Sequence, residues 1–545
     1  MRFSVSYWTG LSLAVLVYPG GPLIAQGQPN RRPAGGGSAR SIVEQAAEAL
    51  GGAARVRAVR NITLTGYGQY AYMFGGGRIT GSPDAPEKYI AANDLRRIYD
   101  LEFGRFQQLE RRNMLFPFLA AFGHSFALSN LILDNDLAYD INGDRPVRVG
   151  RWGETPLQTD GVHMRRMWML NNPIVLVRTL LDPNTELSAP RQEAGRTVID
   201  VTLKPGDKLT AAFAGNHLPT WVRWSNPHTD LGQVTFTTRF TGYDAYSGLL
   251  LPLGYNTRLD WRNVDYLKIY VDDYQVDSKI VDLEAPAAIR DSPEPPSYPV
   301  SPVTSVPVAK GIWRIDQGGT TVIEFKDHLT LFELDANAHQ AKAVLAYART
   351  LAPGKPVTQL IVSHNHFDHA AGLRQAVAEG LTIISRRASE GVFREMATHP
   401  APDFPDDLAK SPKPFKFIPV DERLRFSDET MTLDVLWARN NIHMADAVFA
   451  YAPAQKVVME GDIATAAYDY QFWPDNFRDN LEYYKLDVAK ISPVHSVWRE
   501  HPNVLTIEQV DELIKGGTQR ARQRCAEELA KGTYFAGCPV WSKRY

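Results

Sequence analysis

Apolar and polar residues alternate repeatedly through the first half of the chain. This alternation predicts a mostly antiparallel, β-rich N-terminal domain over residues 41–285. Turn residues separate the alternating runs, as expected of strands that are joined by hairpins. The clearest runs are Asn61–Tyr67, Thr197–Leu203, Val234–Phe240 and Tyr266–Val271.

Two helical segments are predicted in the same half. Apolar residues recur at helical spacing over Ser41–Leu50, and Gly51 and Gly52 follow, which predicts a helix that ends at the glycines. A helical insert between strands is predicted around residues 106–135.

The pattern changes after residue 307, and residues 308–515 are predicted to alternate strands with helices. The apolar runs Gly311–Ile315, Thr321–Phe325 and Leu329–Glu333 predict three consecutive strands. Helical spacing follows over Ala338–Leu351, and Val357–Val362 predicts the next strand. The fold class expected for the chain is therefore α/β in this part, preceded by the β-rich domain.

A proline-rich segment separates the two parts. Seven prolines lie between residues 286 and 307, and proline neither continues a helix nor fits a central strand. We expect a semi-rigid, extended linker over residues 286–307.

The first residues have the features of an export signal. Arg2 precedes the apolar run Leu11–Val17, which is too short to span a bilayer, and cleavage after Ala25 fits a signal peptide over residues 1–25. A signal anchor or a buried N-terminal strand is the alternative. Residues 26–40 are rich in glycine and proline and predict a flexible linker. The protein is thus expected to be periplasmic or extracellular, with no integral membrane segment once the signal is removed.

Composition narrows the class of protein. Of 545 residues, 44% are hydrophobic and 22% are charged, which fits a soluble globular protein with a large core. Lys and Arg number 59 and Asp and Glu 61, so the net charge of −2 argues against nucleic acid as a partner. In an oxidising compartment, Cys525 and Cys538 are expected to form a disulfide within a C-terminal tail over residues 516–545; two free buried thiols are the alternative.

One short segment concentrates the candidate chemistry. Three histidines and one carboxylate, His364, His366, Asp368 and His369, occupy six consecutive positions directly after a predicted strand. Imidazoles and carboxylates are the usual ligands of zinc and iron. Four such close neighbours cannot all bind one ion comfortably, so the spacing indicates a pair of metal ions.

This H-x-H-x-D-H segment, followed by Gly372, resembles the metallo-β-lactamase-fold hydrolase superfamily, in particular a secreted bacterial branch with an HNHFDHAAGLR-type motif. The resemblance implies a C-terminal αββα sandwich and three more ligands, each after an apolar run. His443, Asp462 and His495 match these positions in order. Asp462 would bridge the two metals. A further second-layer acidic residue after the third strand is expected, and either Glu333 or Asp335 fits it.

The resemblance implies a hydrolase that uses two Zn²⁺ ions per chain, with iron or manganese as alternatives. Asp368 would bind the second metal and act as the catalytic residue that orients or deprotonates the attacking water. The expected substrate is a small molecule with an ester, lactone, lactam or thioester-like bond.

Other functions remain open at this point. The chain fits an exported protein that binds an apolar ligand and keeps a vestigial metal site, or an iron-dependent or phosphodiesterase member of the same superfamily. The role of the β-rich domain is also open, and one expectation is that it packs on the second domain and shapes its cleft.

Overall fold

The structure is a computed structural model that describes residues 38–73, 78, 81–115, 126–152, 161–204, 206–296, 300–334, 337–441, 443–463, 473–495, 503–512, 523, 526, 527 and 530. The predicted signal peptide, Asp335, Cys525 and Cys538 lie outside the described residues. Within the described part of the chain, no helix combines the length and the apolar character that a membrane span requires.

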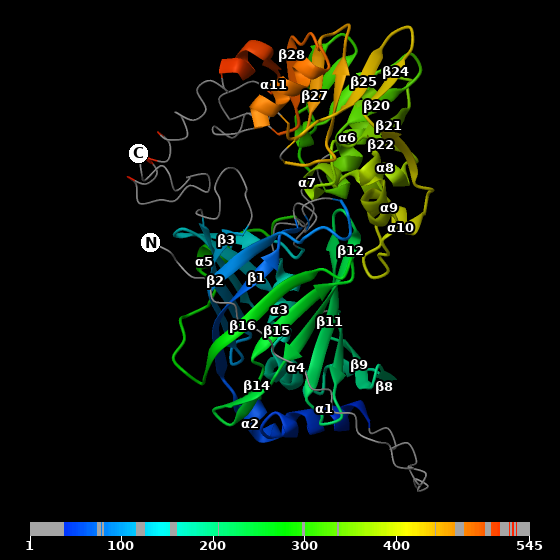
Figure 1. Cartoon of the computed structure of the whole chain (residues 1–545). Coiled ribbons are helices and arrows are strands. Elements are labelled where there is room, and N and C mark those ends of the chain that lie inside the picture. Colours follow the sequence, from blue (N-terminus) through cyan, green and yellow to red (C-terminus); the bar gives the residue numbers. More distant parts are fainter. Residues whose placement is uncertain are drawn as a thin grey trace, which may run out of the picture. The chain divides into compact units, whose positions relative to one another are not determined.

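One large antiparallel sheet forms the β-rich domain. In the described residues its strand order is β6-β5-β4-β3-β2-β1-β16-β15-β12-β11-β10-β9-β7, with β8 paired to β9. Helices α3 and α4 pack against this sheet and bury their apolar faces in its core (Figure 1). The elements of this domain are α1 (Ala39–Ala49), α2 (Ala53–Ala58), β1 (Asn61–Ala71), β2 (Tyr89–Asp100), β3 (Arg105–Met114), β4 (Phe126–Asp134), β5 (Leu137–Asn142), β6 (Arg145–Val149), α3 (Val162–Leu170), α4 (Pro173–Leu180), β7 (Glu186–Leu187), β8 (Arg191–Glu193), β9 (Arg196–Thr202), β10 (Lys208–Phe213), β11 (Pro219–His228), β12 (Gly232–Thr241), β13 (Asp244–Tyr246), β14 (Leu249–Leu251), β15 (Gly254–Leu259) and β16 (Asp265–Val276).

The helical insert predicted around residues 106–135 is wrong. This segment contains β3 and β4, which pair with each other, and β3 also pairs with β2. The misleading feature is the polar composition of β3, whose Gln and Glu residues favour helices. These residues are buried: Gln108 accepts a hydrogen bond from Arg97 at 2.8 Å and donates to the Tyr70 hydroxyl at 2.6 Å, and that hydroxyl lies 3.2 Å from Glu110. A buried polar network therefore replaces the apolar alternation by which a strand is recognised.

The C-terminal domain has the four layers α, β, β and α, which confirms the fold class predicted for it. Two sheets enclose an apolar core built from residues such as Phe332, Val435 and Val448. Helices α6, α8 and α9 pack on the outer face of the first sheet (Figure 1). Phe477 and Leu481 of α11 cover the second sheet. The fold is thus a mixed α/β sandwich preceded by a β-rich domain.

The first sheet of this domain has the order β17-β18-β19-β20-β21-β22-β23, and the second has the order β24-β25-β26-β27-β28-β29. The predicted strands and the predicted helix between residues 311 and 362 are all present. The elements are β17 (Ser305–Ala309), β18 (Ile312–Ile315), β19 (Thr321–Glu324), β20 (Leu329–Phe332), α6 (Ala338–Leu351), β21 (Val357–Ile361), α7 (Phe367–Ala370), α8 (Leu373–Ala378), β22 (Thr382–Arg386), α9 (Glu390–Thr398), α10 (Asp407–Lys410), β23 (Lys416–Val420), β24 (Arg423–Ser427), β25 (Thr432–Trp437), β26 (Val448–Ala452), β27 (Val457–Glu460), α11 (Trp473–Tyr483), β28 (Lys490–Pro493) and β29 (Leu505–Thr506).

The proline-rich segment is not extended throughout. Ala287–Arg290 forms the short helix α5 directly after Pro286, where a proline is compatible with a helix start. Strand β17 already begins at Ser305 and pairs with β18, although Pro307 lies within it. Because β17 is the edge strand of its sheet, the missing N–H of Pro307 breaks no ladder on the outer side.

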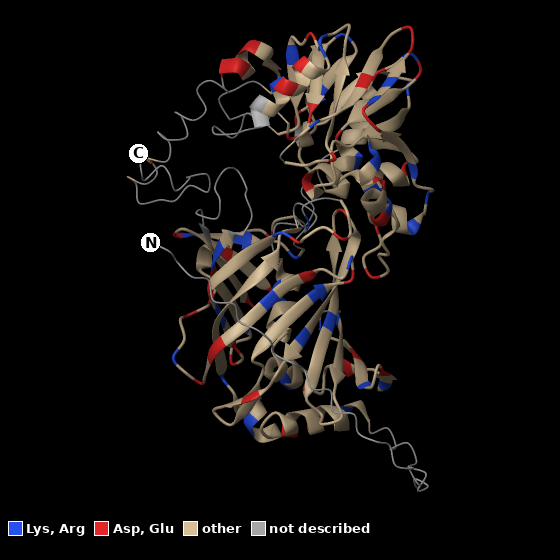
Figure 2. Ribbon diagram, viewed as in Figure 1, with Lys and Arg blue, Asp and Glu red and all other residues tan. Residues whose placement is uncertain are grey.

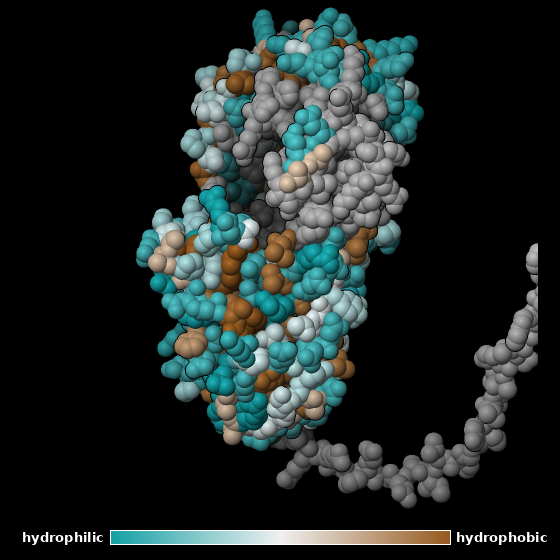
Figure 3. All heavy atoms as spheres, turned by 90° about the vertical axis from the view of Figure 1, so that its left-hand side faces the viewer, coloured by the Kyte–Doolittle hydropathy of each residue, from teal (hydrophilic) through white to brown (hydrophobic). Residues whose placement is uncertain are grey.

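Large apolar side chains are exposed on the β-rich domain, and Figure 3 shows apolar residues scattered among hydrophilic ones over its lower part. Tyr67 and Tyr270 are about half exposed and face each other across β1 and β16. Their rings stack with centroids 5.3 Å apart. Such a cross-strand aromatic pair stabilises the pairing of these two strands.

A buried carboxylate, Asp207, anchors α3 to the sheet of the β-rich domain. It lies 3.0 Å from His163 Nδ1 and also pairs with Arg166. Burial alone would raise the pKa of this carboxyl, but the hydrogen bond and charge of His163 and the charge of Arg166 outweigh burial and lower the pKa to about 2. Because the folded-state pKa lies below the unfolded value, the stabilisation is present above pH 4 and is lost as the pH falls towards 2.

An Asp207→Asn variant is therefore expected to be destabilised by about 2 kcal/mol at pH 7. The difference from the wild type should shrink between pH 4 and pH 2. Urea unfolding at several pH values measures it, with the exposed Asp272→Asn as the control. A difference that is independent of pH would contradict the assignment.

Candidate metal centre

The predicted ligands follow strands that end at one edge of the C-terminal domain. β20 and β21 are parallel, and Phe332 pairs with Ile361, so Glu333 and the histidine segment leave the sheet side by side. In the second sheet, β27 and β28 are parallel, and Glu460 pairs with Pro493. Because parallel strands end at the same edge of a sheet, Asp462 and His495 follow neighbouring strands.

The two sheets of the C-terminal domain approach each other closely where His364 follows β21. A side chain at Gly461 would place its Cβ 2.3 Å from Ser363 Oγ, so only glycine allows this close approach. The carbonyl of Ser363 also accepts a hydrogen bond from Val448 N at 2.8 Å. Gly461 therefore brings Asp462 of the second sheet next to His364 of the first.

The first donor group consists of His364, His366, His443 and Asp462, whose ligand atoms all lie within 4.8 Å of one another. The Nε2 atoms of His364 and His366 are buried and make no hydrogen bond. The Nδ1 atom of His364 lies 2.8 Å from Ser363 Oγ, so Nε2 is the nitrogen whose lone pair can bind a metal ion. Buried nitrogens without a partner are costly unless a cation completes them, so this group fits a metal ion.

The second donor group consists of Asp368, His369, Asp462 and His495. The Nε2 atoms of His369 and His495 are 3.1 Å apart, and Asp462 Oδ1 lies 3.2 Å from His495 Nε2. Asp368 Oδ2 lies 3.3 Å from His495 Nε2. The lone pairs of four side chains thus converge on one point, as in a metal site.

Asp462 belongs to both groups, and it lies at the centre of the electrostatics of the site. Its Oδ2 atom is 3.0 Å from His443 Nε2 and 3.3 Å from His369 Nε2. Burial alone would raise the pKa of this carboxyl, but the charges of His369 and His495 hold the pKa well below its usual value. One carboxylate is therefore placed to contact two cations.

The histidines divide into two electrostatic classes. Burial and the neighbouring histidines lower the pKa of His364 and His366 well below the usual value. Burial also opposes the charged form of His369 and His495, but the carboxylates outweigh it, raising the pKa of His495 to about 9 and that of His369 well above the usual value. The second group thus has a negative potential that favours cations.

Glu333 fits the role behind the ligands that the sequence offered to Glu333 or Asp335, and Asp335 lies outside the described residues. Its carboxylate is buried, accepts a hydrogen bond from Ser363 N at 2.6 Å and lies 3.6 Å from His369 Nδ1. Its backbone has a φ of 64°, in the left-handed region that costs energy for any residue except glycine. This strained backbone conformation places the Glu333 carboxylate next to Nδ1 of His369.

Two other predicted ligands, His443 and His495, are positioned by contacts with residues outside the donor groups. Asn441 Oδ1 accepts hydrogen bonds from the backbone N–H groups of His443 and Met444 at 2.8 and 2.9 Å, which forms a tight turn at His443. The buried Arg314 donates to the carbonyls of Pro493 and Val494 at 3.0 and 3.2 Å, directly before His495.

The residues after the histidine segment also have structural roles. Gly372 N donates to Leu334 O at 2.7 Å, and a Cβ at Gly372 would overlap Leu334 at 2.3 Å. Arg374 is buried and donates to Asp406 at 2.6 and 3.0 Å and to Met396 O at 2.6 Å. The motif therefore continues past the ligands because its glycine and arginine fix the helix that follows.

Lys88, directly before β2 in the β-rich domain, is a residue near the centre that the sequence did not point to. Burial lowers the pKa of its ammonium group to about 8, and the charge of Asp368 opposes this shift. Its charge in turn acts on His366. Nearby, a Cβ at Gly81 would lie 3.7 Å from the Asn365 side chain. No local motif marks Lys88, because the β-rich domain brings it to the site only through the tertiary fold.

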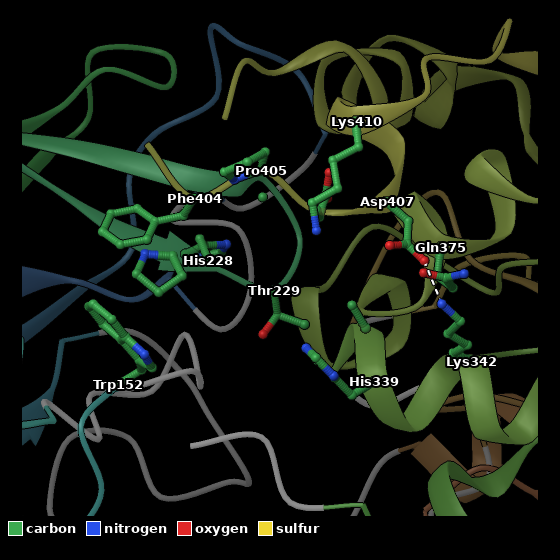
Figure 4. A pocket seen from close by; sticks show the side chains of 14 residues that line it. Trp152, His228, Thr229, His339, Lys342, Gln375, Phe404, Pro405, Asp407 and Lys410 are labelled. Carbon is green, nitrogen blue, oxygen red and sulfur yellow. Dashed lines mark hydrogen bonds and ion pairs between the residues drawn. The ribbon is translucent and has the colours of Figure 1, made fainter. Parts of the chain in front are cut away.

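A pocket of about 420 Å³ lies between the β11–β12 turn of the β-rich domain and helices α6, α8 and α10 (Figure 4). Trp152, His228 and Phe404 gather on one side of it, and His339 and Lys342 lie on the other. Lys342 is paired with Asp407 at 2.9 Å. Among the described residues that line this pocket, none belongs to the two donor groups.

Comparison with known proteins agrees with this geometry. Residues 326–495 match the sequence profile of the metallo-beta-lactamase superfamily. A linear primary-alkylsulfatase from Pseudomonas sp. is 36% identical over 75 residues, which cover 13% of this chain and 11% of the length of that relative.

Two solved structures give more distant similarities. A metallo-beta-lactamase from Pontibacter korlensis has 13% sequence identity and a TM-score of 0.30, over 39% of this chain and 98% of the other. A stereoselective inverting sec-alkylsulfatase from Pseudomonas sp. has 16% identity and a TM-score of 0.28, over 42% of this chain and 44% of the other.

Proposed function

The chain belongs to the metallo-beta-lactamase superfamily through its C-terminal domain, which is a metal-dependent hydrolase fold, and from this premise we propose that the protein is a dinuclear zinc hydrolase acting on a small molecule. The observation that carries the proposal is the position of Asp462, shared by two donor groups that each contain histidines. His364, His366, His443 and Asp462 would hold one ion, and Asp368, His369, Asp462 and His495 the other.

The side chains of the site divide the work of hydrolysis. When bound, a pair of divalent ions supplies Lewis acidity and lowers the pKa of a water molecule towards neutrality. The Oδ1 atom of Asp368 is buried and makes no hydrogen bond, while Oδ2 faces His369 and His495. Asp368 Oδ1 is thus placed to orient the attacking water and to accept its proton. No side chain is needed as a covalent nucleophile, so we propose direct attack by water.

We propose a scissile ester, lactone, lactam or thioester-like bond. The test is to purify the full chain, measure bound zinc and assay lactams, lactones, thioesters, carboxylic esters, phosphodiesters and alkyl sulfates. His366→Ala should lose metal and activity, while the exposed His339→Ala should keep both. Absence of bound metal after growth with added zinc would refute the dinuclear proposal, and activity that persists in His366→Ala would place the chemistry elsewhere.

A sulfate ester is the second candidate substrate, and two observations favour it. The relative with local sequence similarity is a linear primary-alkylsulfatase, and its name gives an alkyl sulfate as its substrate. Lys88 adds a positive charge near Asp368, which suits a substrate that carries a negative charge.

A Lys88→Met variant should distinguish charged from neutral substrates. If Lys88 binds an anionic group, KM for an alkyl sulfate should rise about tenfold, since a charge-assisted contact contributes about 1.5 kcal/mol or more. KM for a neutral ester should change little, and Lys410→Met, which removes an exposed lysine, is the control. Steady-state kinetics measure both, and an equal change for the two substrates would contradict an anion-binding role.

Charge supports a small molecule as the substrate instead of a nucleic acid. Figure 2 shows basic and acidic residues intermixed over the described strands and helices. The net charge of the whole chain is −2. We further propose export, on the basis of Arg2, the apolar run Leu11–Val17 and Ala25. The N-terminus of the protein recovered outside the cytoplasm would show whether cleavage follows Ala25.

A further inference from the structure

We propose that the β-rich domain is a working part of the metal centre, because it clamps Phe367, the residue between the ligands His366 and Asp368. In this proposal, His228 and Trp261 of the β-rich domain hold the phenyl ring and thereby set the positions of the ligands on either side of it. The proposal rests on the proposed metal-binding function and names the positioning residues of that site.

The clamp is formed by rings at the ends of two separate strands. The Phe367 side chain has no exposed surface. Its ring centroid lies 5.2 Å from that of His228 at an interplanar angle of 75°, and 5.5 Å from that of Trp261 at 47°. His228 ends β11, and Trp261 follows β15, so both loops at this end of the large sheet reach the same ring.

The ligand loop has little internal support of its own. Phe367 begins α7, a helix of four residues, with His366 at the position before it. A helix of one turn has no stability by itself, because its nucleation cost exceeds the gain from so few hydrogen bonds. Packing of a side chain therefore helps to hold this turn, and Phe367 is the large apolar side chain within it.

Both clamping rings are themselves fixed. His228 Nδ1 accepts hydrogen bonds from the backbone N–H groups of Asp230 and Leu231 at 3.2 and 3.3 Å. Burial, together with the charges of His399 and Arg374, lowers the pKa of His228 to about 3, so the ring is neutral at neutral pH. A neutral ring can remain against Phe367 without the cost of a buried charge.

The loop that carries Trp261 is fastened to the opposite domain by the next residue, Arg262. The guanidinium group of Arg262 lies 5.0 Å from the centre of the Trp261 ring and pairs with Glu395 of α9. The adjacent arginine thus ties the loop of Trp261 to the C-terminal domain and packs on the Trp261 ring.

Further contacts fasten the two domains beside the clamp. Gln233 Oε1 accepts hydrogen bonds from the backbone N–H groups of Asp403 and Phe404 at 2.8 and 3.2 Å, and its Nε2 atom donates to Asp403 at 3.1 Å. At Gly232, a Cβ would lie 2.7 Å from the Arg374 guanidinium group, so the β11–β12 turn packs directly on the motif arginine. These contacts make the clamp part of a continuous, packed boundary.

The test compares two tryptophan variants of the full chain. Trp261→Leu removes one side of the clamp, and Trp168→Leu removes a tryptophan that is equally buried in the same domain but has no ring contact with Phe367. Zinc affinity is measured by competition with a chromophoric chelator, and the Tm of the metal-free protein is measured in parallel. We expect Trp261→Leu to weaken zinc binding about 10–100-fold, the usual effect of removing a residue that supports a ligand.

Trp168→Leu should lower the Tm and leave zinc affinity unchanged. Phe367→Leu, which keeps an apolar side chain, provides a second measurement and should weaken zinc binding as well, even if Trp261→Leu fails to fold. Wild-type zinc affinity in a folded Trp261→Leu or Phe367→Leu variant would overturn the proposal. Failure of the wild-type protein to bind zinc would instead contradict the proposed function, so the two failures are distinguishable.

Discussion

An Asp462→Asn variant is expected to lose most of its bound metal and to lose activity by a factor on the order of 10³. The substitution keeps the size of the side chain but removes the charge that both donor groups share. An amide also replaces one carboxylate oxygen with an N–H donor, which repels a cation. Since Asp462 lies 3.0 Å from His443 and 3.2 Å from His495, neither group retains its full set of donors.

Metal content per chain and kcat/KM are the measurements for this variant. Asp487→Asn is the matched control, because Asp487 is exposed and pairs only with Lys456 among the ion pairs of the described residues. Retention of both metals and of wild-type activity in Asp462→Asn would show that the carboxylate does not bridge. The loss of one metal alone would restrict Asp462 to a single group.

Glu333→Gln is expected to weaken metal binding and kcat/KM about 10–100-fold, the range typical of residues that orient a ligand. The amide oxygen of glutamine can still accept the hydrogen bond from Ser363 N, so the strand end should keep its place. What is lost is the negative charge 3.6 Å from His369 Nδ1, which favours the proton on that nitrogen and frees Nε2 for a metal.

The readout that separates this role from a general loss of stability is metal affinity at unchanged Tm. Glu324→Gln is the control, because Glu324 also ends a strand of the same sheet and forms an ion pair with Lys355 at 2.7 Å, remote from the ligands in the chain. If both variants bind zinc equally well, Glu333 has only a structural role. A larger loss in Glu333→Ala than in Glu333→Gln would fit the two separate contacts of the carboxylate.

The β-rich domain contributes residues that lie close to the candidate metal site. Lys88, His228 and Trp261 all come from this domain and reach the histidine segment or its neighbours. The expectation that the domain shapes the cleft of its partner is compatible with this placement. A hydrolase built in this way depends on both domains for its metal site, so we expect an isolated C-terminal domain to bind metal poorly.

Much of the site could be predicted from the sequence, because the information is local. Four ligand candidates lie within six residues, and the donor chemistry of imidazole and carboxylate does not depend on the fold. His443, Asp462 and His495 could be predicted because each follows an apolar run, and the ends of such strands meet at one edge. The three strands and the helix between residues 311 and 362 could also be predicted, because their periodicity is visible over a few residues.

The remaining features depend on residues that are distant in the chain. The segment around residues 106–135 was predicted to be helical, but it contains β3. The polar side chains of β3 are compatible with a buried strand because Arg97 and Tyr70 form hydrogen bonds with them, and these partners could not be read from the sequence. The contact of Glu333 with His369 could not be read from the sequence, and neither could the packing of two rings from the other domain against Phe367. By itself, the sequence determined the α/β class and predicted the candidate metal-binding residues and their order, because these follow from residue type and short-range periodicity. Only the tertiary structure decided that Glu333 lies behind His369 and that the β-rich domain packs on Phe367. The second contact joins residues more than a hundred positions apart, which packing alone brings together.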